Sequence, residues 1–279
     1  MNKTKIEWVI NPNGSPGFTF NPFTGCLHSC SYCYARKIAN RFQPDAKGRE
    51  AIKQMCEYRK FGEVYVLDEP IRINGKAQPF PFGFQPTYHR YRLMDSFKRR
   101  IPSTIFVNDM SDIMGECWYS HWVREIITMM REASQHTFLL LTKNPIRYFE
   151  FSFPENVWLG QTFDGIVRPG KTFESLFENL NGITNKTFLS FEPLIRDSSD
   201  SNWKFTDIIE WTKPRWVIVG AQSRPAKLSS TQDVIDIIEH CQIFDDNSIP
   251  VFLKNNLQSF FPDQPLMQEF PCNYISNEG

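Results

Sequence analysis

The sequence predicts an α/β protein built on a TIM-like parallel β/α barrel, partial or complete. Two observations lead to this fold class. Short apolar, β-favouring runs alternate with segments of helical periodicity, and seven such runs occur within 279 residues. This alternation is typical of right-handed βαβ units and hence of a parallel sheet. The runs cover residues 17–20, 103–108, 136–142, 156–162, 186–192, 215–220 and 250–254.

Helical periodicity separates several of these runs. Residues 118–133 repeat large apolar side chains every three to four positions, which is typical of an amphipathic helix with one buried face. Ser230 or Thr231 is a candidate N-cap for a helix that follows. The same spacing recurs in residues 34–42, 173–180 and 234–241.

One domain is expected over residues 1–262. Residues 43–100 interrupt the alternation with Pro, Phe and basic residues, so we expect a long loop excursion over the barrel mouth. Residues 263–279 are polar and are expected to form a C-terminal tail docked at the surface.

Composition narrows the class of protein. The 31 basic residues balance 31 acidic residues, which disfavours a protein that coats duplex nucleic acid through bulk charge. The N-terminus lacks the apolar region of a signal peptide, and the apolar runs are far shorter than a membrane span. We therefore expect a cytoplasmic protein without a membrane partner.

Three of the seven cysteines, Cys26, Cys30 and Cys33, crowd into eight residues. In a reducing cytosol this pattern indicates metal or redox chemistry. Tetrahedral zinc would need a fourth ligand, for which His28 or a distant cysteine could serve. An iron–sulfur cube with three protein ligands would leave one iron open for a small molecule. The scattered cysteines are interpreted as small hydrophobic residues: Cys56, Cys117, Cys241 and Cys272.

Polar residues follow several of the predicted strands. In α/β barrels the carboxyl ends of the strands carry the chemistry, so we expect these residues to share one rim. They lie at 108–112, 142–144, 161–162, 192–193, 222–223 and 254–255.

The segment NPFTGCLHSCSYCYAR (21–36), with Tyr32 before its third cysteine, resembles the CX3CX2C signature of the radical S-adenosylmethionine superfamily. Within it, the segment is similar to the branch that contains spore photoproduct lyase. From about residue 6 to 257, the chain resembles a family of phage-associated proteins of unassigned function. This likeness includes FVNDMSDIMGE (106–116), HTFLLLTKNPIRY (136–148), NVWLGQTFD (156–164), FLSFEPLI (188–195), WVIVGAQS (216–223) and PVFLKNNL (250–257).

The resemblance implies a mechanism. Cys26, Cys30 and Cys33 would hold three irons of a [4Fe–4S] cluster, and S-adenosylmethionine would chelate the fourth. An electron donor of the flavodoxin or ferredoxin type would reduce the cluster. Cleavage of S-adenosylmethionine would then give a 5′-deoxyadenosyl radical that abstracts a substrate hydrogen.

The resemblance also suggests which residues hold S-adenosylmethionine. Tyr32 and Tyr34 would lie near the adenine, although either could be a core tyrosine. Ser111 and Asp112 resemble a Ser-Asp pair that holds this molecule; helix capping is the alternative for Asp112. Lys143 would offer a charge to the methionyl carboxylate. Two further candidates for cofactor or substrate binding are Thr162 and Glu192.

The chain departs from the pattern of its relatives in two respects. It contains no Gly-Gly pair, so the Gly-Gly-Glu element that grips the cofactor amino group in many radical enzymes is missing. Relatives often carry a Gly-Glu-Ser stretch where this chain has Gly220-Ala221-Gln222-Ser223. No acidic role is therefore expected there.

The substrate class depends on residues 88–92 and 98–100, which interleave aromatic rings with positive charge. Such a segment suits bases and phosphates, although a solvated helix face has the same composition. We expect a radical enzyme that acts on nucleic acid, in repair or base modification. A radical enzyme for a small metabolite or peptide is one alternative, and a zinc- or cluster-stabilised binding module without turnover is another. No catalytic residue is predicted.

Overall fold

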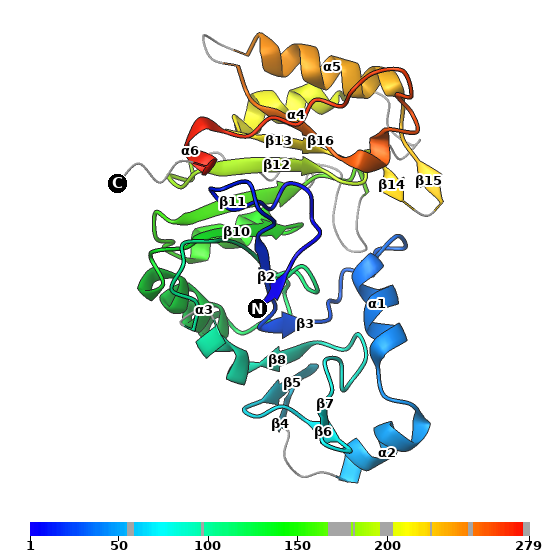
Figure 1. The fold of residues 1–279 in the computed structure, drawn as a ribbon, viewed down its shortest axis with the longest axis vertical. Helices are drawn as coiled ribbons and strands as arrows, with labels where there is room; N and C mark the ends of the chain where they lie inside the picture. Colours follow the sequence, from blue (N-terminus) through cyan, green and yellow to red (C-terminus); the bar gives the residue numbers. More distant parts are fainter. Residues whose placement is uncertain are drawn as a thin grey trace.

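A large parallel sheet forms the centre of the protein (Figure 1). The computed structural model describes residues 1–54, 59–95, 98–166, 180, 182–195, 203–223, 225–244 and 248–275. The strand order is β1-β2-β9-β10-β11-β12-β13-β16, in which β1 is antiparallel to β2 and the other neighbours are parallel. The bounds are β1 Asn2–Lys3, β2 Phe18–Phe20, β9 Thr104–Val107, β10 Thr137–Thr142, β11 Val157–Thr162, β12 Thr187–Phe191, β13 Val217–Val219 and β16 Val251–Leu253. All seven predicted strand segments are confirmed.

The predicted α/β fold with a large parallel sheet is confirmed. Of the two predicted forms, partial or complete barrel, a complete barrel is not observed in the part of the chain that the structure describes. Within the described residues, the ladders run from β1 to β16, and no ladder joins β16 back to the other edge. The C-terminal segment lies against β16 instead. The Leu253 amide donates to the Met267 carbonyl oxygen (2.8 Å), and the Glu269 amide donates to that of Val251 (3.0 Å).

The two faces of the sheet carry different cores because successive side chains of a strand point to opposite faces. One face is rich in aromatic rings, and Gly160 makes room for one of them: a Cβ there would lie 2.2 Å from the Phe188 ring. The rings on this face belong to Trp8, Phe106, Trp158, Phe188, Trp216, Phe252 and Tyr274. The opposite face packs against helices.

The helices follow the predicted periodicity where the structure describes them. α3 (Ser120–Glu132) buries one stripe on β9, β10 and β11, and α5 (Thr231–Gln242) packs with α4 (Phe205–Thr212) over β12, β13 and β16. The Ser230 hydroxyl accepts the Asp233 amide (2.9 Å), which confirms it as the N-cap of α5. The helix expected at 173–180 lies outside the described residues except for buried Leu180. α4 was not predicted.

The structure corrects the expectation of a loop at residues 43–100. β3 (Phe23–Thr24), β8, β5 and β4 form a second, four-stranded sheet in that order. It lies beyond β2, at the end of the molecule away from β13 and β16 (Figure 1). Val64, Val66 and Tyr88 of this sheet join the α3 core, so the excursion extends that core. Phe80 and Phe84 of the same excursion pack against a cluster that includes Met110, just after β9. Its elements are α2 Ala46–Gln54, β4 Arg59–Phe61, β5 Val64–Leu67, β6 Arg72–Ile73, β7 Lys76–Ala77, β8 Thr87–His89 and the 3-10 helix η1 Arg90–Asp95.

The remaining elements are short, apart from α1 (Tyr34–Phe42), which begins directly after the cysteine segment. No helix in the described portion of the chain is both long and apolar enough to cross a membrane. The short elements are η2 Pro145–Glu150, β14 Gln222–Ser223, β15 Ala226–Lys227, η4 Asn255–Leu257 and α6 Cys272–Ile275.

The C-terminal segment is embedded more deeply than a surface tail. The side chain of Tyr274 is only 3% exposed, and its hydroxyl donates to the Trp8 carbonyl oxygen (2.8 Å). Trp216 Nε1 donates to the Glu269 carbonyl oxygen (3.0 Å). Residues 263–275 therefore complete the ring-rich core of the large sheet.

We expect Tyr274→Ala to lower the free energy of unfolding by about 3 kcal/mol, because it leaves a cavity among aromatic rings and removes a buried hydrogen bond. Urea unfolding followed by circular dichroism measures the change. Asp263→Ala, at an exposed position of the same segment, is the control and should stay within about 0.5 kcal/mol of the parent. Equal stability of the two variants would show that the segment is only attached to the surface.

Candidate functional site

The three clustered cysteines lie on the loop between β3 and α1, and none of them forms a disulfide within the described residues. Cys33 is the N-cap of α1, and its Sγ accepts the Arg36 amide (3.3 Å). Cys26 Sγ accepts the His28 amide (3.4 Å). Backbone N–H groups and the positive end of a helix both favour thiolate over thiol. The loop therefore presents sulfur atoms where negative charge is stabilised.

Burial disfavours the thiolate form of Cys26. Burial, followed by the nearby Asp112 carboxylate, raises the pKa of Cys26 to about 12. Among the residues that the structure describes, no three His, Cys, Asp or Glu side chains surround one point as a single metal ion would require.

Asp112 fastens the cysteine loop to the end of β10. His28 Nε2 and the Lys143 amide donate to its Oδ2 (2.9 and 2.8 Å), while the Thr142 hydroxyl and the Met114 amide donate to its Oδ1 (2.7 and 2.9 Å). Burial alone would raise the pKa of Asp112. The hydrogen bond and charge of His28, with the Lys143 and Thr142 hydrogen bonds, outweigh burial and lower this pKa to about 2. The carboxylate is thus ionised, and each of its two oxygen atoms accepts two hydrogen bonds from the protein.

Ser111 and Asp112 both make internal contacts in the structure. The Ser111 hydroxyl donates to the Gly25 carbonyl oxygen (2.6 Å), which joins the turn after β9 to the start of the cysteine loop. Asp112 does not cap the next helix, because the N-cap of α3 is Tyr119.

Two other candidates, Tyr32 and Lys143, both contact Asp164, which was not predicted from the sequence as a site residue. Lys143 Nζ donates to Asp164 Oδ2 (3.0 Å), and the Tyr32 hydroxyl donates to the same oxygen. Lys143 Nζ also lies 5.5 Å from the centre of the Tyr32 ring. The Asp164 side chain is 1% exposed. The sequence signal for Asp164 is its position two residues beyond β11. This signal is weak, because polar residues follow other strands as well.

Glu192 forms a second ion pair at the strand ends, with Lys254 Nζ. Gly220 lies against this pair: a Cβ there would be 3.0 Å from Lys254 Cδ and 3.4 Å from Glu192 Cγ. Ser190 shares a strand face with Glu192; its fully buried hydroxyl has no hydrogen-bond partner within the described part of the chain. Thr162 ends β11 and is partly buried.

Tyr34 takes a different position from Tyr32. Its hydroxyl donates to the Asp109 carbonyl oxygen (2.7 Å), but more than half of the residue is exposed. Asp109 follows β9 and accepts a hydrogen bond from Asn21 Nδ2 (2.5 Å). Burial raises the pKa of Asp109. The hydroxyl of Tyr34 is thus fixed to the turn after β9, while much of the rest of the residue is exposed to solvent on α1.

The segment that favoured nucleic acid is partly buried, while Arg90, Lys98 and Arg100 remain exposed. Tyr88 and His89 are fully buried, so neither ring is available for stacking on a base. The cationic side chains also have internal contacts. These join Arg90 to Glu125 (2.8 Å), Arg92 to the Asn21 carbonyl oxygen (2.8 Å), Lys98 to Asp95 (2.7 Å) and the Arg99 Cζ to the Phe18 ring (4.1 Å to its centre).

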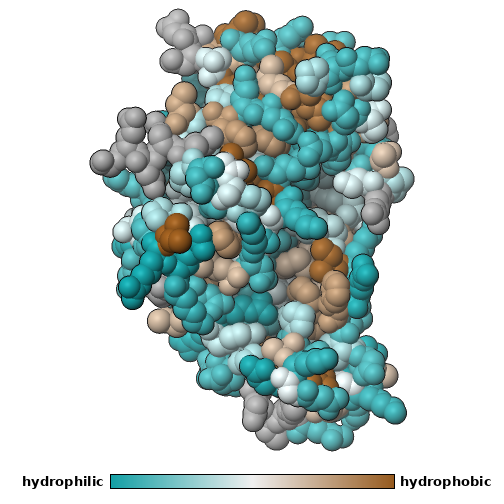
Figure 2. All heavy atoms as spheres, in the orientation of Figure 1, coloured by the Kyte–Doolittle hydropathy of each residue, from teal (hydrophilic) through white to brown (hydrophobic). Residues whose placement is uncertain are grey.

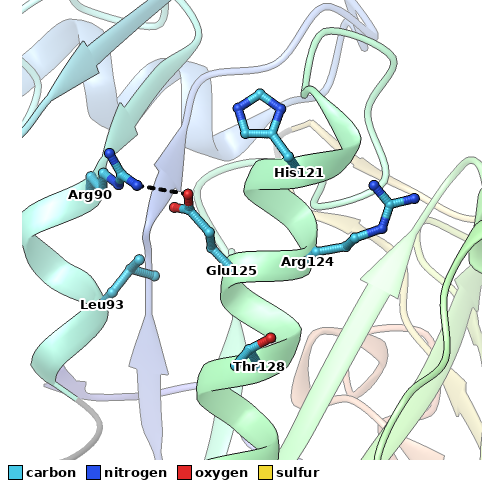
Figure 3. Close-up of a pocket in the computed structure, with 6 residues that line it drawn as sticks. All are labelled: Arg90, Leu93, His121, Arg124, Glu125 and Thr128. Carbon is cyan, nitrogen blue, oxygen red and sulfur yellow. Dashed lines mark hydrogen bonds and ion pairs between the residues drawn. The ribbon is translucent and has the colours of Figure 1, made fainter.

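A surface hollow lies between η1 and α3 (Figure 3). In Figure 3 Arg90 points across it to Glu125, while Arg124 points away from that pair. Glu125 also accepts the Tyr88 hydroxyl (2.6 Å), so its charge is already compensated. None of the predicted cofactor or metal ligands lines this hollow. Its lining consists of Arg90, Leu93, His121, Arg124, Glu125 and Thr128.

The chain is similar to proteins of one sequence family and to two solved structures. A model of the family described as "Protein of unknown function (DUF5131)" matches residues 3–256. No curated protein matches significantly. Both structures are variants of spore photoproduct lyase at 11% identity, and the second holds AdoMet and a dinucleoside spore photoproduct. The first match covers 73% of this chain and 55% of the other, with a TM-score of 0.43; the second covers 88% and 66%, with a TM-score of 0.44.

We expect Asp112→Asn to lower the free energy of unfolding at neutral pH by about 2 kcal/mol, because the folded-state pKa of Asp112 is about 2 and its unfolded value is 3.8. A lowered pKa stabilises the fold above the unfolded value, so the parent should lose this contribution as the pH falls from about 4 to about 2. The variant should lack that part of the acid dependence. Urea unfolding at several pH values measures it.

The matched control is Asp263→Asn, which changes an exposed carboxylate. If Asp112→Asn and Asp263→Asn have the same stability and the same pH profile, Asp112 does not fasten the loop.

Proposed function

We propose that this chain, which belongs to the family described as "Protein of unknown function (DUF5131)", is a radical S-adenosylmethionine enzyme. The observation that carries the proposal is the placement of Cys26, Cys30 and Cys33. Their loop is bound through Asp112 to the carboxyl end of β10, where the Lys143–Asp164 ion pair lies. A three-cysteine loop next to charged strand ends is the arrangement that this chemistry needs.

The cysteine loop fits a [4Fe–4S] cluster in two respects. Two of its sulfur atoms accept backbone N–H groups, as cluster thiolates do: Cys26 from His28 within the loop, and Cys33 from Arg36 in the first turn of α1. The chain also has no Asp or Glu between Glu7 and Asp45, and the Asp112 carboxylate that opposes the Cys26 thiolate from outside this segment is hydrogen-bonded to His28 of the loop. A cube lets each thiolate bind a different iron, so the sulfur atoms need not surround one point. We assign Cys26, Cys30 and Cys33 as its ligands.

When bound, the cluster and S-adenosylmethionine would supply a 5′-deoxyadenosyl radical that abstracts a substrate hydrogen. The chain's own residues would bind and orient the molecule. An ammonium has three N–H donors, so Lys143 can keep its bond to Asp164 and donate another to the methionyl carboxylate. Asp164 also fixes the Tyr32 hydroxyl, which leaves that ring oriented for stacking.

The unpartnered Ser190 hydroxyl supports ligand binding at the strand ends, because buried polar groups in proteins are almost always hydrogen-bonded. We place Ser190 in the binding site together with Glu192, Thr162 and Tyr34. Asp112 and Ser111 are assigned a positioning role instead, since each is hydrogen-bonded to the protein.

The substrate class is not assigned to nucleic acid. Arg90, Arg92 and Arg99 contact other residues of the protein, and Arg90 is exposed, so residues 88–100 do not by themselves distinguish a nucleic acid from a small metabolite or peptide, and nucleic acid stays a prediction.

Anaerobically reconstituted protein should hold about four iron and four sulfide per chain. Replacement of Cys26, Cys30 or Cys33 by Ala should remove the cluster, because three ligands are needed. Cys241→Ala, at a buried position of α5, should retain it. Iron and sulfide assays measure both. Stoichiometric zinc without iron, after anaerobic expression with ample iron, would contradict the proposal; a loaded cluster with no cleavage of S-adenosylmethionine under dithionite would indicate a binding module.

Lys143→Ala should weaken the binding of S-adenosylmethionine by about 1–3 kcal/mol, the range for a charge-assisted hydrogen bond. Calorimetric titration of the cluster-loaded protein measures the affinity. The control is Lys186→Ala, which removes an ammonium 5.4 Å from the Trp158 ring at the amino end of the strands. If Lys143→Ala binds as tightly as Lys186→Ala, then Lys143 only pairs with Asp164.

A further inference from the structure

α1 exposes a large apolar surface beside the cysteine loop. Tyr34, Ile38 and Phe42 are 54%, 38% and 53% exposed, and their spacing of four places them along one face of the helix. The buried side of α1 carries only Ala35 and Ala39. Figure 2 shows brown and tan atoms in the region of α1, below a hollow in the surface. Burial of Ile38 and Phe42 by a partner would remove much of this surface from water.

The same face is positively charged. Lys37 and Arg41 are exposed, and each lies three or four positions from Ile38 or Tyr34. The Arg41 guanidinium lies 5.4 Å from the centre of the Phe42 ring. Acidic residues are absent from 8–44, although the chain contains 31 of them and has no net charge. The charge at α1 is thus local and unopposed along this segment.

The position of the face connects it to the cysteines. α1 begins at its N-cap Cys33, so the first turn of the face adjoins a proposed cluster ligand. Leu27, inside the loop, is also exposed, at 55%. An electron that enters the cluster must come from a donor at the protein surface, and this surface lies within one helix of the thiols.

We propose that Lys37, Ile38, Arg41 and Phe42, called the α1 docking face, bind an acidic one-electron carrier protein with a flavin or iron–sulfur group. This inference rests on the proposed function. The carrier would lose one electron, the cluster would gain it, and the oxidised carrier would dissociate. An apolar centre with flanking charge is typical of protein interfaces, in which complementary charge steers association. Few cations and an aliphatic Ile38 suit a phosphate backbone less well.

The test compares the parent with the double variant Lys37→Glu, Arg41→Glu, both loaded with the cluster. The control is Lys3→Glu, Lys76→Glu, which makes the same change in net charge at two other exposed positions. Calorimetry measures the binding of oxidised flavodoxin and of ferredoxin at low and high salt. Stopped-flow bleaching measures reduction of the cluster by each reduced carrier and by dithionite.

We expect at least one carrier to bind the parent and the control, with affinity that falls as salt rises. The α1 variant should bind it at least tenfold more weakly and be reduced by it at least tenfold more slowly. All three proteins should be reduced by dithionite at the same rate, because a small reductant needs no docking face. Ile38→Asp should reproduce the loss without reversing a cation.

Equal binding and reduction of the α1 variant and the control would overturn the docking face, as would failure of both carriers to bind the parent. Displacement of the carrier by a mixed-sequence oligonucleotide at low salt would assign the face to nucleic acid and also overturn it. A parent that holds no cluster, or that does not cleave S-adenosylmethionine with dithionite, would instead contradict the proposed function, since that reaction bypasses the carrier.

Discussion

The site depends on one buried carboxylate. Asp112 receives hydrogen bonds from His28 in the cysteine loop, from Thr142 and Lys143 at the end of β10, and from its own turn. A buried charge is tolerated only when it is fully hydrogen-bonded. The four donors therefore cannot separate without leaving Asp112 uncompensated. The position of the cysteines relative to the strand ends is consequently fixed by the cost of exposing one charge.

The strand ends near this carboxylate contain two ion pairs, Lys143 with Asp164 and Glu192 with Lys254. Each charge in these pairs already has a partner of opposite sign. A ligand that carries both an amino group and a carboxylate would meet a group of opposite sign for each of its charges here, and Lys143 could bind the carboxylate without losing Asp164.

The sequence predicted what depends on local pattern. Apolar runs identified the parallel strands, and the spacing of Cys26, Cys30 and Cys33 identified the loop that Asp112 fastens. The second sheet could not be predicted, because β3 pairs with β8 through contacts such as Phe23 with Tyr88, far apart in the chain. Asp164 was missed because one acidic residue after a strand does not differ from ordinary loop polarity. Residues 88–92 show a related limit: composition does not reveal that Tyr88 and His89 are buried, and the nucleic-acid substrate stays a prediction.

The hydrogen bond from Tyr274 to the Trp8 carbonyl oxygen joins residues 266 positions apart. Closing so long a loop has a high entropic cost, and such contacts form slowly compared with the neighbouring strand and helix pairs. The helix-covered face of the sheet can assemble from local units, whereas the ring-rich face stays open to water until this contact forms. A folding intermediate of this protein should therefore expose tryptophan and phenylalanine rings, and it would be a substrate for chaperones that recognise aromatic surfaces.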